Sequence, residues 1–183
     1  VMNCCHKLKD QLEQSQWRNE NIRVTIDDRD MRGGDKVWQH IKQGVPVRVE
    51  IGPRDLAEGT VSIARRDEPP KQKLSMPLED FPKKAADLLE SVQANILKKA
   101  VDFRESHSST IDKKAEISEF FDSKQDTSGF AYVHVADDPA VAEALDPLKV
   151  TVRCTPMDWP EEPGKCLYTG KSVQRRSVIS RSY

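Results

Sequence analysis

Residues 44–56, GVPVRVEIGPRDL, decide the fold of the first part of this 183-residue chain. Aliphatic residues occupy every second position from 45 to 51, with polar residues between two pairs of them. This alternation predicts a strand that buries the aliphatic side chains and turns Arg48 and Glu50 to the opposite face. The Gly-Pro pair at 52–53 then ends the strand.

Two further strands and a helix flank this stretch. Residues 22–26, IRVTI, alternate in the same way, and the charged run DDRD stops them. Residues 60–67, TVSIARRD, predict a third strand, antiparallel to the second. A short helix at 36–43, which Gly44 ends, separates the first two strands. This order predicts a small mixed α/β domain.

The rest of the chain changes character after this domain. A linker-like stretch with three prolines, at 68–77, precedes an amphipathic helix at 78–104. The remainder predicts short elements: a helix at 113–122, a strand at 130–135, a helix at 140–145, a strand at 150–156 and a hairpin at 165–183, which has five basic residues and no acids. We therefore expect three parts: a mixed sheet flanked by helices at 1–72, a helical connector at 73–125 and a small α+β module at 126–183.

Composition excludes several classes of protein. Lys and Arg number 29 against 30 Asp and Glu, so the chain has no generally basic coat, and any nucleic acid must meet a local basic face. No apolar run approaches the roughly 18 residues that span a bilayer, and residues 1–14 lack the apolar stretch of a signal peptide. Four cysteines do not make a secreted disulfide scaffold. We expect reduced thiols, no membrane and a cytoplasmic protein.

No catalytic constellation is visible. The chain has no GxSxG, P-loop or GxGxxG motif, and its four histidines have no paired spacing. The carboxylate pairs at 27–28 and 137–138 are neighbours in sequence, so on a strand they would point to opposite faces. We interpret them as turn and cap residues. Catalytic residues and metal ligands are therefore expected to be absent.

The basic residues of the first domain are the candidate site. Guanidinium groups bind phosphate in a bidentate manner, and aromatic faces stack on unpaired bases, a combination that suits single-stranded RNA. Composition alone favours the alternative of a solvated polar face balanced by nearby aspartates. The basic set comprises Arg29, Arg32, Lys36, Arg48, Arg54, Arg65 and Arg66, with Trp38 between them.

Four segments, in this order, resemble a known family. IRVTIDDRD at 22–30, GGDK at 33–36, GVPVRVEIGPRDL at 44–56 and VSIARRD at 61–67 resemble the anticodon-binding domain of prolyl-tRNA synthetases. The ending GKCLYTGKSVQRRSVISRSY resembles the C-terminal extension of the archaeal/eukaryotic-like type. The resemblance covers essentially the whole chain.

The resemblance implies a fold and a function. The family's domain is a five-stranded mixed sheet, whose first strand would precede residue 1. The full enzyme joins proline to tRNA(Pro) with ATP and Mg²⁺. Its class II catalytic core would lie upstream, so this segment alone is expected to be inactive. The implied partners are tRNA(Pro), the catalytic domain of the same protein and, at full length, a second subunit of a homodimer.

The family pattern and side-chain direction together name the site. Trp38 is either a stacking partner or a cover for the sheet, and Glu50 accepts from a guanine amino group. The terminal carboxylate of Tyr183 is expected to dock toward the catalytic domain. The full set of RNA-binding residues is Arg29, Arg32, Lys36, Trp38, Arg48, Glu50 and Arg54.

The chain departs from zinc-bearing members of the family. Those members carry a Cys-x4-Cys pair, which aligns with Ala136 and Val141 here, and a Cys-x2-Cys pair, of which only Cys166 remains, with Thr169 opposite. Three of four ligands are missing, so we expect no zinc. Two other classes of function stay open: a free-standing RNA-binding module, and a structural or protein-interaction domain that does not bind RNA.

Overall fold

A computed structural model describes residues 1–121 and 129–181, and contacts divide the chain into two compact units, Val1–Lys98 and Lys99–Tyr183. The expected division into three parts, at 72/73 and 125/126, stays a prediction. Among the described residues, no helix is both long and apolar enough to cross a membrane.

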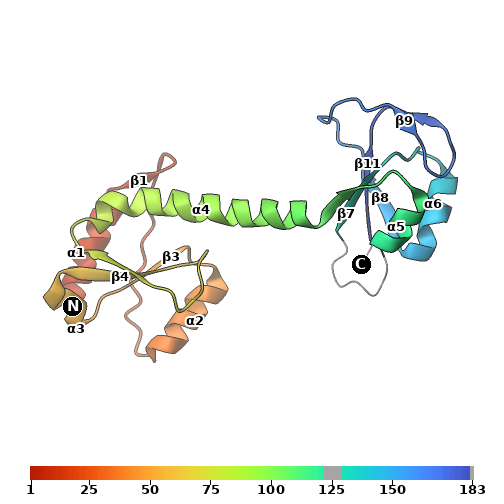
Figure 1. Cartoon of the computed structure of the whole chain (residues 1–183). Coiled ribbons are helices and arrows are strands. Elements are labelled where there is room, and N and C mark those ends of the chain that lie inside the picture. Colours follow the sequence, from red (N-terminus) through yellow and green to blue (C-terminus); the bar gives the residue numbers. More distant parts are fainter. Residues whose placement is uncertain (122–128, 182–183) are drawn as a thin grey trace. The chain divides into compact units, whose positions relative to one another are not determined.

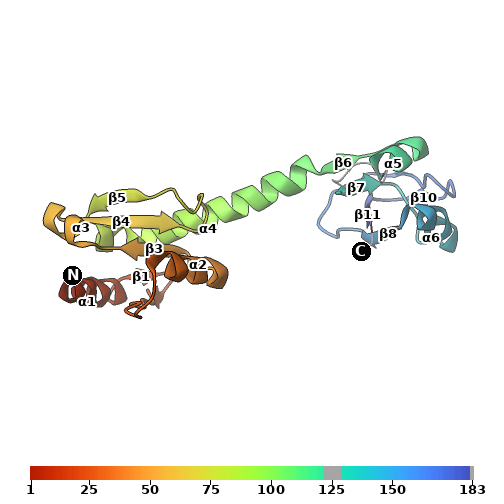
Figure 2. The same ribbon diagram turned by 90° about the horizontal axis from the view of Figure 1, so that it is seen from below.

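The first unit contains a three-stranded antiparallel sheet. Its strands β3 (Val47–Glu50), β4 (Thr60–Arg65) and β5 (Leu74–Pro77) lie in the order β3-β4-β5, side by side in Figure 2. The other elements of this unit are α1 (Met2–Glu13), the two-stranded ribbon β1 (Gln16–Trp17) and β2 (Glu20–Asn21), α2 (Gly33–Gln43), α3 (Pro53–Glu58) and the beginning of α4 (Phe81–Ser106).

The core of this unit lies on one face of the sheet. Val61 and Ile63 of β4 are almost fully buried against leucines of α1 and against Phe81, Ala85 and Leu88 of α4. Register pairs Val49 with Ile63 and Arg48 with Ala64, so Arg48 lies on the face opposite this core. The predicted inward direction of Val61 and Ile63 is confirmed.

Three predictions for this unit need correction. Residues 22–26 keep the alternating burial, and Ile22 and Val24 pack against the core, but the segment joins no strand ladder among the described residues. Alternation records which side chains are buried, whereas a strand also needs a hydrogen-bonding neighbour. The expected linker at 68–77 contains β5, and the six-residue helix α3 stands between β3 and β4.

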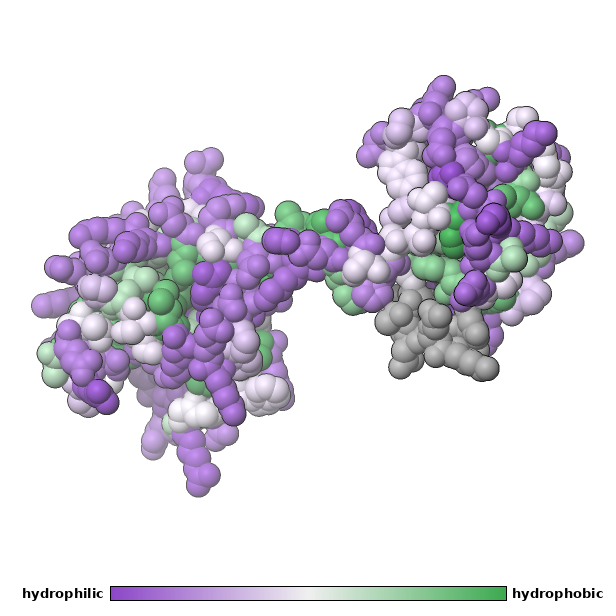
Figure 3. All heavy atoms as spheres, viewed as in Figure 1, coloured by the Kyte–Doolittle hydropathy of each residue, from purple (hydrophilic) through white to green (hydrophobic). Residues whose placement is uncertain are grey.

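The helix α4 begins and ends close to the prediction of 78–104. Its buried residues end at Val92, and Leu97 and Phe103 are 60% and 65% exposed. Hydrophobic side chains are accordingly visible on the C-terminal half of α4 in Figure 3, whereas hydrophilic ones cover most of the visible face of the first unit.

The second unit is built on a four-stranded sheet of order β6-β7-β11-β8. Among its described strands, β6 pairs with β7 in parallel and the other pairs are antiparallel, and β9 and β10 form a separate hairpin. Its elements are β6 (Ser108–Thr110), α5 (Lys114–Phe120), β7 (Phe130–Val133), α6 (Pro139–Leu145), the 3-10 helix η1 (Asp146–Leu148), β8 (Val150–Cys154), β9 (Gly164–Lys165), β10 (Ser172–Val173) and β11 (Ser177–Arg181).

This unit has its own core. Ile117 and Phe121 pack with Val133, Leu145 and Ile179, all of which are nearly inaccessible to solvent. The predicted short elements are largely present. The predicted terminal hairpin is confirmed for β9 and β10, but β11 leaves it and pairs with β7 and β8 in the main sheet.

Candidate nucleic-acid interface

The structure separates the predicted RNA-binding residues into three places. The first lies on α2 and the segment before it, the second on β3, and the third on α3. Figures 1 and 2 show α2 and α3 at opposite ends of the sheet, so these residues do not form one continuous ridge. The groups are Arg29, Arg32, Lys36 and Trp38; Arg48 and Glu50; and Arg54 alone.

Asp27 organises the first group. Arg29 donates to both carboxylate oxygens of Asp27, at 2.8 and 2.7 Å, and His40 Nε2 lies 2.8 Å from Oδ2. Lys36 Nζ donates to the Asp27 carbonyl at 3.1 Å. The hydrogen bonds from Arg29, and to a lesser extent the one with His40, hold the pKa of Asp27 well below its usual range. The charge of Arg29 is therefore balanced within the protein, as the alternative of a neutralised polar face predicts.

Trp38 and Arg32 remain available on this side. The Trp38 side chain is 57% exposed, and its one ring contact among the described residues is Lys42 Nζ, 5.6 Å from the centroid. Of the two roles left open, the geometry therefore favours a stacking platform over a cover for the sheet. Arg32 is exposed at the N-cap of α2, and its side chain has no ion pair within the described part of the chain.

Arg48 occupies an unusual environment. The side chain is only 9% exposed, and its Nε atom is buried without a hydrogen-bond acceptor among the described residues. It lines a small cavity of about 50 Å³ whose other walls are Ile41 and Val45, from the end of α2, and Arg65, Arg66, Glu68 and Pro70. The predicted face is right, but the predicted exposure is wrong, because α2 and the loop after β4 cover that end of β3. Val45, predicted to be on the core face, lines this cavity instead.

The other two arginines of the cavity differ in how their charge is balanced. Arg65 donates to both oxygens of Asp67, at 2.9 and 2.6 Å, and these bonds lower the pKa of Asp67 to about 2. Arg66 is exposed and donates only a long bond of 3.4 Å to the Gly44 carbonyl. In the described residues, Arg48 and Arg66 therefore have no carboxylate at ion-pair distance. Arg66 belongs to the basic set that the sequence indicates, but not to the narrower set of RNA-binding residues that the family pattern names.

Glu50 and Arg54 have partners of their own. Lys73 Nζ binds Glu50 Oε2 at 2.6 Å, and Glu50 Oε1 is buried without a donor among the described residues. Arg54 is 89% exposed in its side chain and pairs with Glu58 one helical turn away. Such an exposed pair opens easily, because water competes for both charges. Tyr183, the predicted docking residue, lies outside the described residues.

The chain is similar to one known protein family and to several known proteins. Residues 1–88 match the family described as "Anticodon binding domain". Over its whole length the chain is 39% identical to a proline–tRNA ligase of Bdellovibrio bacteriovorus and 36% identical to one of Rhodopirellula baltica, of which it covers 37% and 36%. The structure of prolyl-tRNA synthetase from Cryptosporidium parvum has the same fold, with a TM-score of 0.82 at 24% identity, over the whole chain and 37% of that protein.

The matches cover the chain in two ways. Residues 1–88 are similar to anticodon-binding domains. The chain as a whole is similar to the proline–tRNA ligases named above, and it spans about 37% of their length.

Proposed function

We propose that this chain binds the anticodon loop of tRNA(Pro), as part of a synthetase that joins proline to that tRNA with ATP. The observation that carries the proposal is Arg48: a guanidinium group, buried in an anticodon-binding domain, with no carboxylate at ion-pair distance in the described structure. An uncompensated buried charge is costly, and a bound anion or an acceptor-rich base edge would offset that cost.

The neighbouring groups suit a single-stranded nucleotide. Arg48 and the exposed Arg66 lie on one cavity and offer guanidinium donors to a phosphate or to guanine O6 and N7. The Glu50 side chain is 41% exposed on the same sheet face and offers a carboxylate to a guanine amino group. Trp38, with its exposed ring, supplies a stacking surface on α2.

The remaining predicted residues take different roles. Arg32 and the exposed Arg54 suit contacts with the phosphate backbone, because their side chains reach solvent. Arg29 and Lys36 instead hold the start of α2 against Asp27, which positions Trp38. This division replaces the single basic face that the sequence predicted.

The chemistry of ligation belongs to the rest of the synthetase in this proposal. ATP, Mg²⁺ and proline would bind a catalytic domain of the same protein, a homodimer would form at full length, and the enzyme would act in the cytoplasm. The archaeal/eukaryotic-like type remains our proposal for the subtype. The likeness of the whole chain, second unit included, to the fold of the Cryptosporidium enzyme supports it, whereas the relatives named above are bacterial.

The second unit is proposed to fold without zinc. Cys166 is buried, and its Sγ accepts a long hydrogen bond of 3.4 Å from the Thr169 N–H. The positions aligned with the other ligands hold Ala136, Val141 and Thr169, and Val141 packs in the hydrocarbon core. One thiol cannot supply the four ligands of a structural zinc site. Metal analysis of the purified chain that finds one tightly bound zinc per molecule would overturn this.

Filter binding of the chain to tRNA(Pro) at several salt concentrations tests the main proposal. We expect binding that favours tRNA(Pro) over the same tRNA with a changed anticodon. The substitutions Arg48→Ala and Arg54→Ala should each weaken it and lower the salt slope by about one unit if a phosphate contact is lost. Unchanged affinity in both variants at moderate salt, or no preference for the anticodon, would contradict the proposal.

A further inference from the structure

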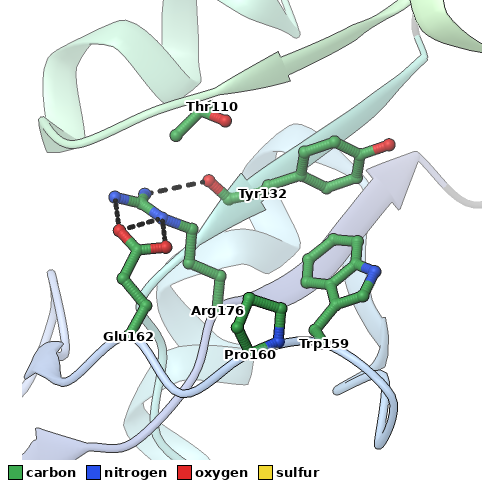
Figure 4. A pocket seen from close by; sticks show the side chains of 6 residues that line it. All are labelled: Thr110, Tyr132, Trp159, Pro160, Glu162 and Arg176. Atoms are coloured by element: carbon green, nitrogen blue, oxygen red, sulfur yellow. Dashed lines mark hydrogen bonds and ion pairs between the residues drawn. The ribbon is translucent and has the colours of Figure 1, made fainter.

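The second unit contains a cavity that the proposed tRNA site does not use. Its volume is about 280 Å³, and it is lined by Thr110, Tyr132, Trp159, Pro160, Glu162 and Arg176. The Tyr132 and Trp159 rings meet edge to face at 4.9 Å between centroids, and Figure 4 shows them opposite the ion pair of Glu162 with Arg176. One wall is thus aromatic and the other is charged.

Arg176 has no donor left for a ligand. Its Nε binds Glu162 at 2.9 Å, and the NH2 group binds Glu162 at 2.7 Å and Asp112 at 2.6 Å. The NH1 group makes longer bonds, of 3.4 and 3.3 Å, to the carbonyls of Ile111 and Tyr132. An arginine has five N–H donors, and all five are taken. An anion that entered the cavity would therefore find no free donor on this side chain.

The carboxylates of the charged wall, in contrast, remain accessible. The Glu162 and Asp112 side chains are 54% and 67% exposed, so their remaining lone pairs face solvent. The bonds from Arg176 keep the pKa of Glu162 below its usual value, which maintains its negative charge. Arg176 also fixes the position of the Glu162 carboxylate, because the arginine is itself 90% buried.

The surroundings add to the negative charge. Residues 155–164, TPMDWPEEPG, contain Asp158, Glu161 and Glu162 and no basic residue. Arg175 pairs with Glu161, and Arg176 pairs with both Asp112 and Glu162, so these five groups together carry a formal charge of −1. This charge disfavours a phosphate and favours a cation.

We propose that this cavity binds an arginine or lysine side chain presented by a protein partner. The cation would lie against the faces of Trp159 and Tyr132 and donate hydrogen bonds to the carboxylates of Glu162 and Asp112. The site is separate from the proposed anticodon contacts, so its failure would leave the proposed function standing.

The indole N–H resonances of the three tryptophans test the proposal in the intact chain. Trp17 and Trp38 lie in the first unit and act as internal references for Trp159. Titration with acetyl-Gly-Arg-Gly-amide should shift the Trp159 resonance in a saturable manner and leave the other two unchanged. The neutral peptide acetyl-Gly-Gln-Gly-amide should shift it at least about threefold less at equal concentration.

Two matched variants locate the charge. Glu162→Gln should weaken the arginine peptide about threefold to tenfold, whereas Glu161→Gln removes the same charge from the same loop but not from the cavity wall, and should change affinity less than twofold. Asp112→Asn provides a second test if Glu162→Gln alters the NMR spectrum of the unit. Equal shifts with the two peptides, equal effects of the two glutamate variants, or a larger shift with adenosine monophosphate would each overturn the proposal.

Discussion

The carboxylate of Asp67 is fully excluded from solvent and accepts hydrogen bonds from Arg65 on both oxygens, at 2.9 and 2.6 Å. Asn95 Nδ2 of α4 donates to the same carboxylate at 2.7 Å, and Arg65 also reaches Ser91 of α4 at 3.1 Å. This cluster joins the end of β4 to α4 next to the cavity of Arg48. It therefore supports the wall of the candidate site.

Removal of the Asp67 charge should destabilise the first unit. Asp67→Asn leaves Arg65 partly buried without its counter-ion, so we expect a loss of about 2–4 kcal/mol in the free energy of unfolding. Chemical denaturation followed by circular dichroism measures it. The matched control Asp10→Asn removes a charge from an exposed position of α1 and should change stability by less than about 0.5 kcal/mol. Equal effects of the two variants would contradict this role of Asp67.

The same carboxylate should make stability depend on pH in acid. Its pKa is about 2 in the folded chain, below the ordinary value of 3.8, so the folded state binds its proton less readily than the unfolded state does. The stability that Asp67 contributes is present above about pH 4 and is lost as the pH falls toward 2. The difference in unfolding free energy between the wild type and Asp67→Asn should therefore shrink over that interval. A constant difference from pH 6 to pH 2.5 would show that the charge of Asp67 is not its source.

Arg48 should lower the stability of the folded chain and strengthen its binding to tRNA. Arg48→Met removes an unbalanced charge from a nearly buried position, so we expect the unfolding free energy to rise by about 1–3 kcal/mol. The same change should weaken binding to tRNA(Pro) about tenfold or more, because a guanidinium contact is lost. The control Lys7→Met removes a charge from α1, which packs on the opposite face of the sheet, and should alter neither property. A less stable Arg48→Met variant would indicate that the arginine is a structural residue.

Trp38 should contribute to tRNA affinity and hardly at all to the stability of the fold. Its ring is mostly exposed, so Trp38→Ala should change stability by less than about 0.5 kcal/mol. Loss of a stacking platform should weaken tRNA binding by about 1–3 kcal/mol. Fluorescence titration and thermal unfolding of the same variant separate the two effects. The comparison variant is Trp17→Phe, since the Trp17 indole N–H binds Glu90 at 2.9 Å within the protein, and its tRNA affinity should not change.

Local patterns predicted the main elements well. The alternation in TVSIARRD and VPVRVE identified β4 and β3, and the helical period identified α4 to within a few residues. The same reasoning failed where an element depends on a partner. Residues 22–26 alternate but pair with no strand in the described chain, and β5 forms within a proline-containing stretch because the edge of β4 accepts it.

The candidate site likewise has features that follow from local sequence and features that depend on a partner. The basic and aromatic residues of the first domain, and the face of β3 on which Arg48 and Glu50 lie, could be predicted from the residues alone, because strand geometry alternates without regard to the rest of the fold. Which of these charges are balanced depends on the packing of segments that are distant in the chain. Asp27 forms an ion pair with Arg29, and Asp67 forms one with Arg65. The end of α2 covers Arg48, and no carboxylate lies within ion-pair distance of it in the described structure. Such pairing depends on distances of a few ångströms between segments far apart in the chain, and the order of residues does not contain those distances.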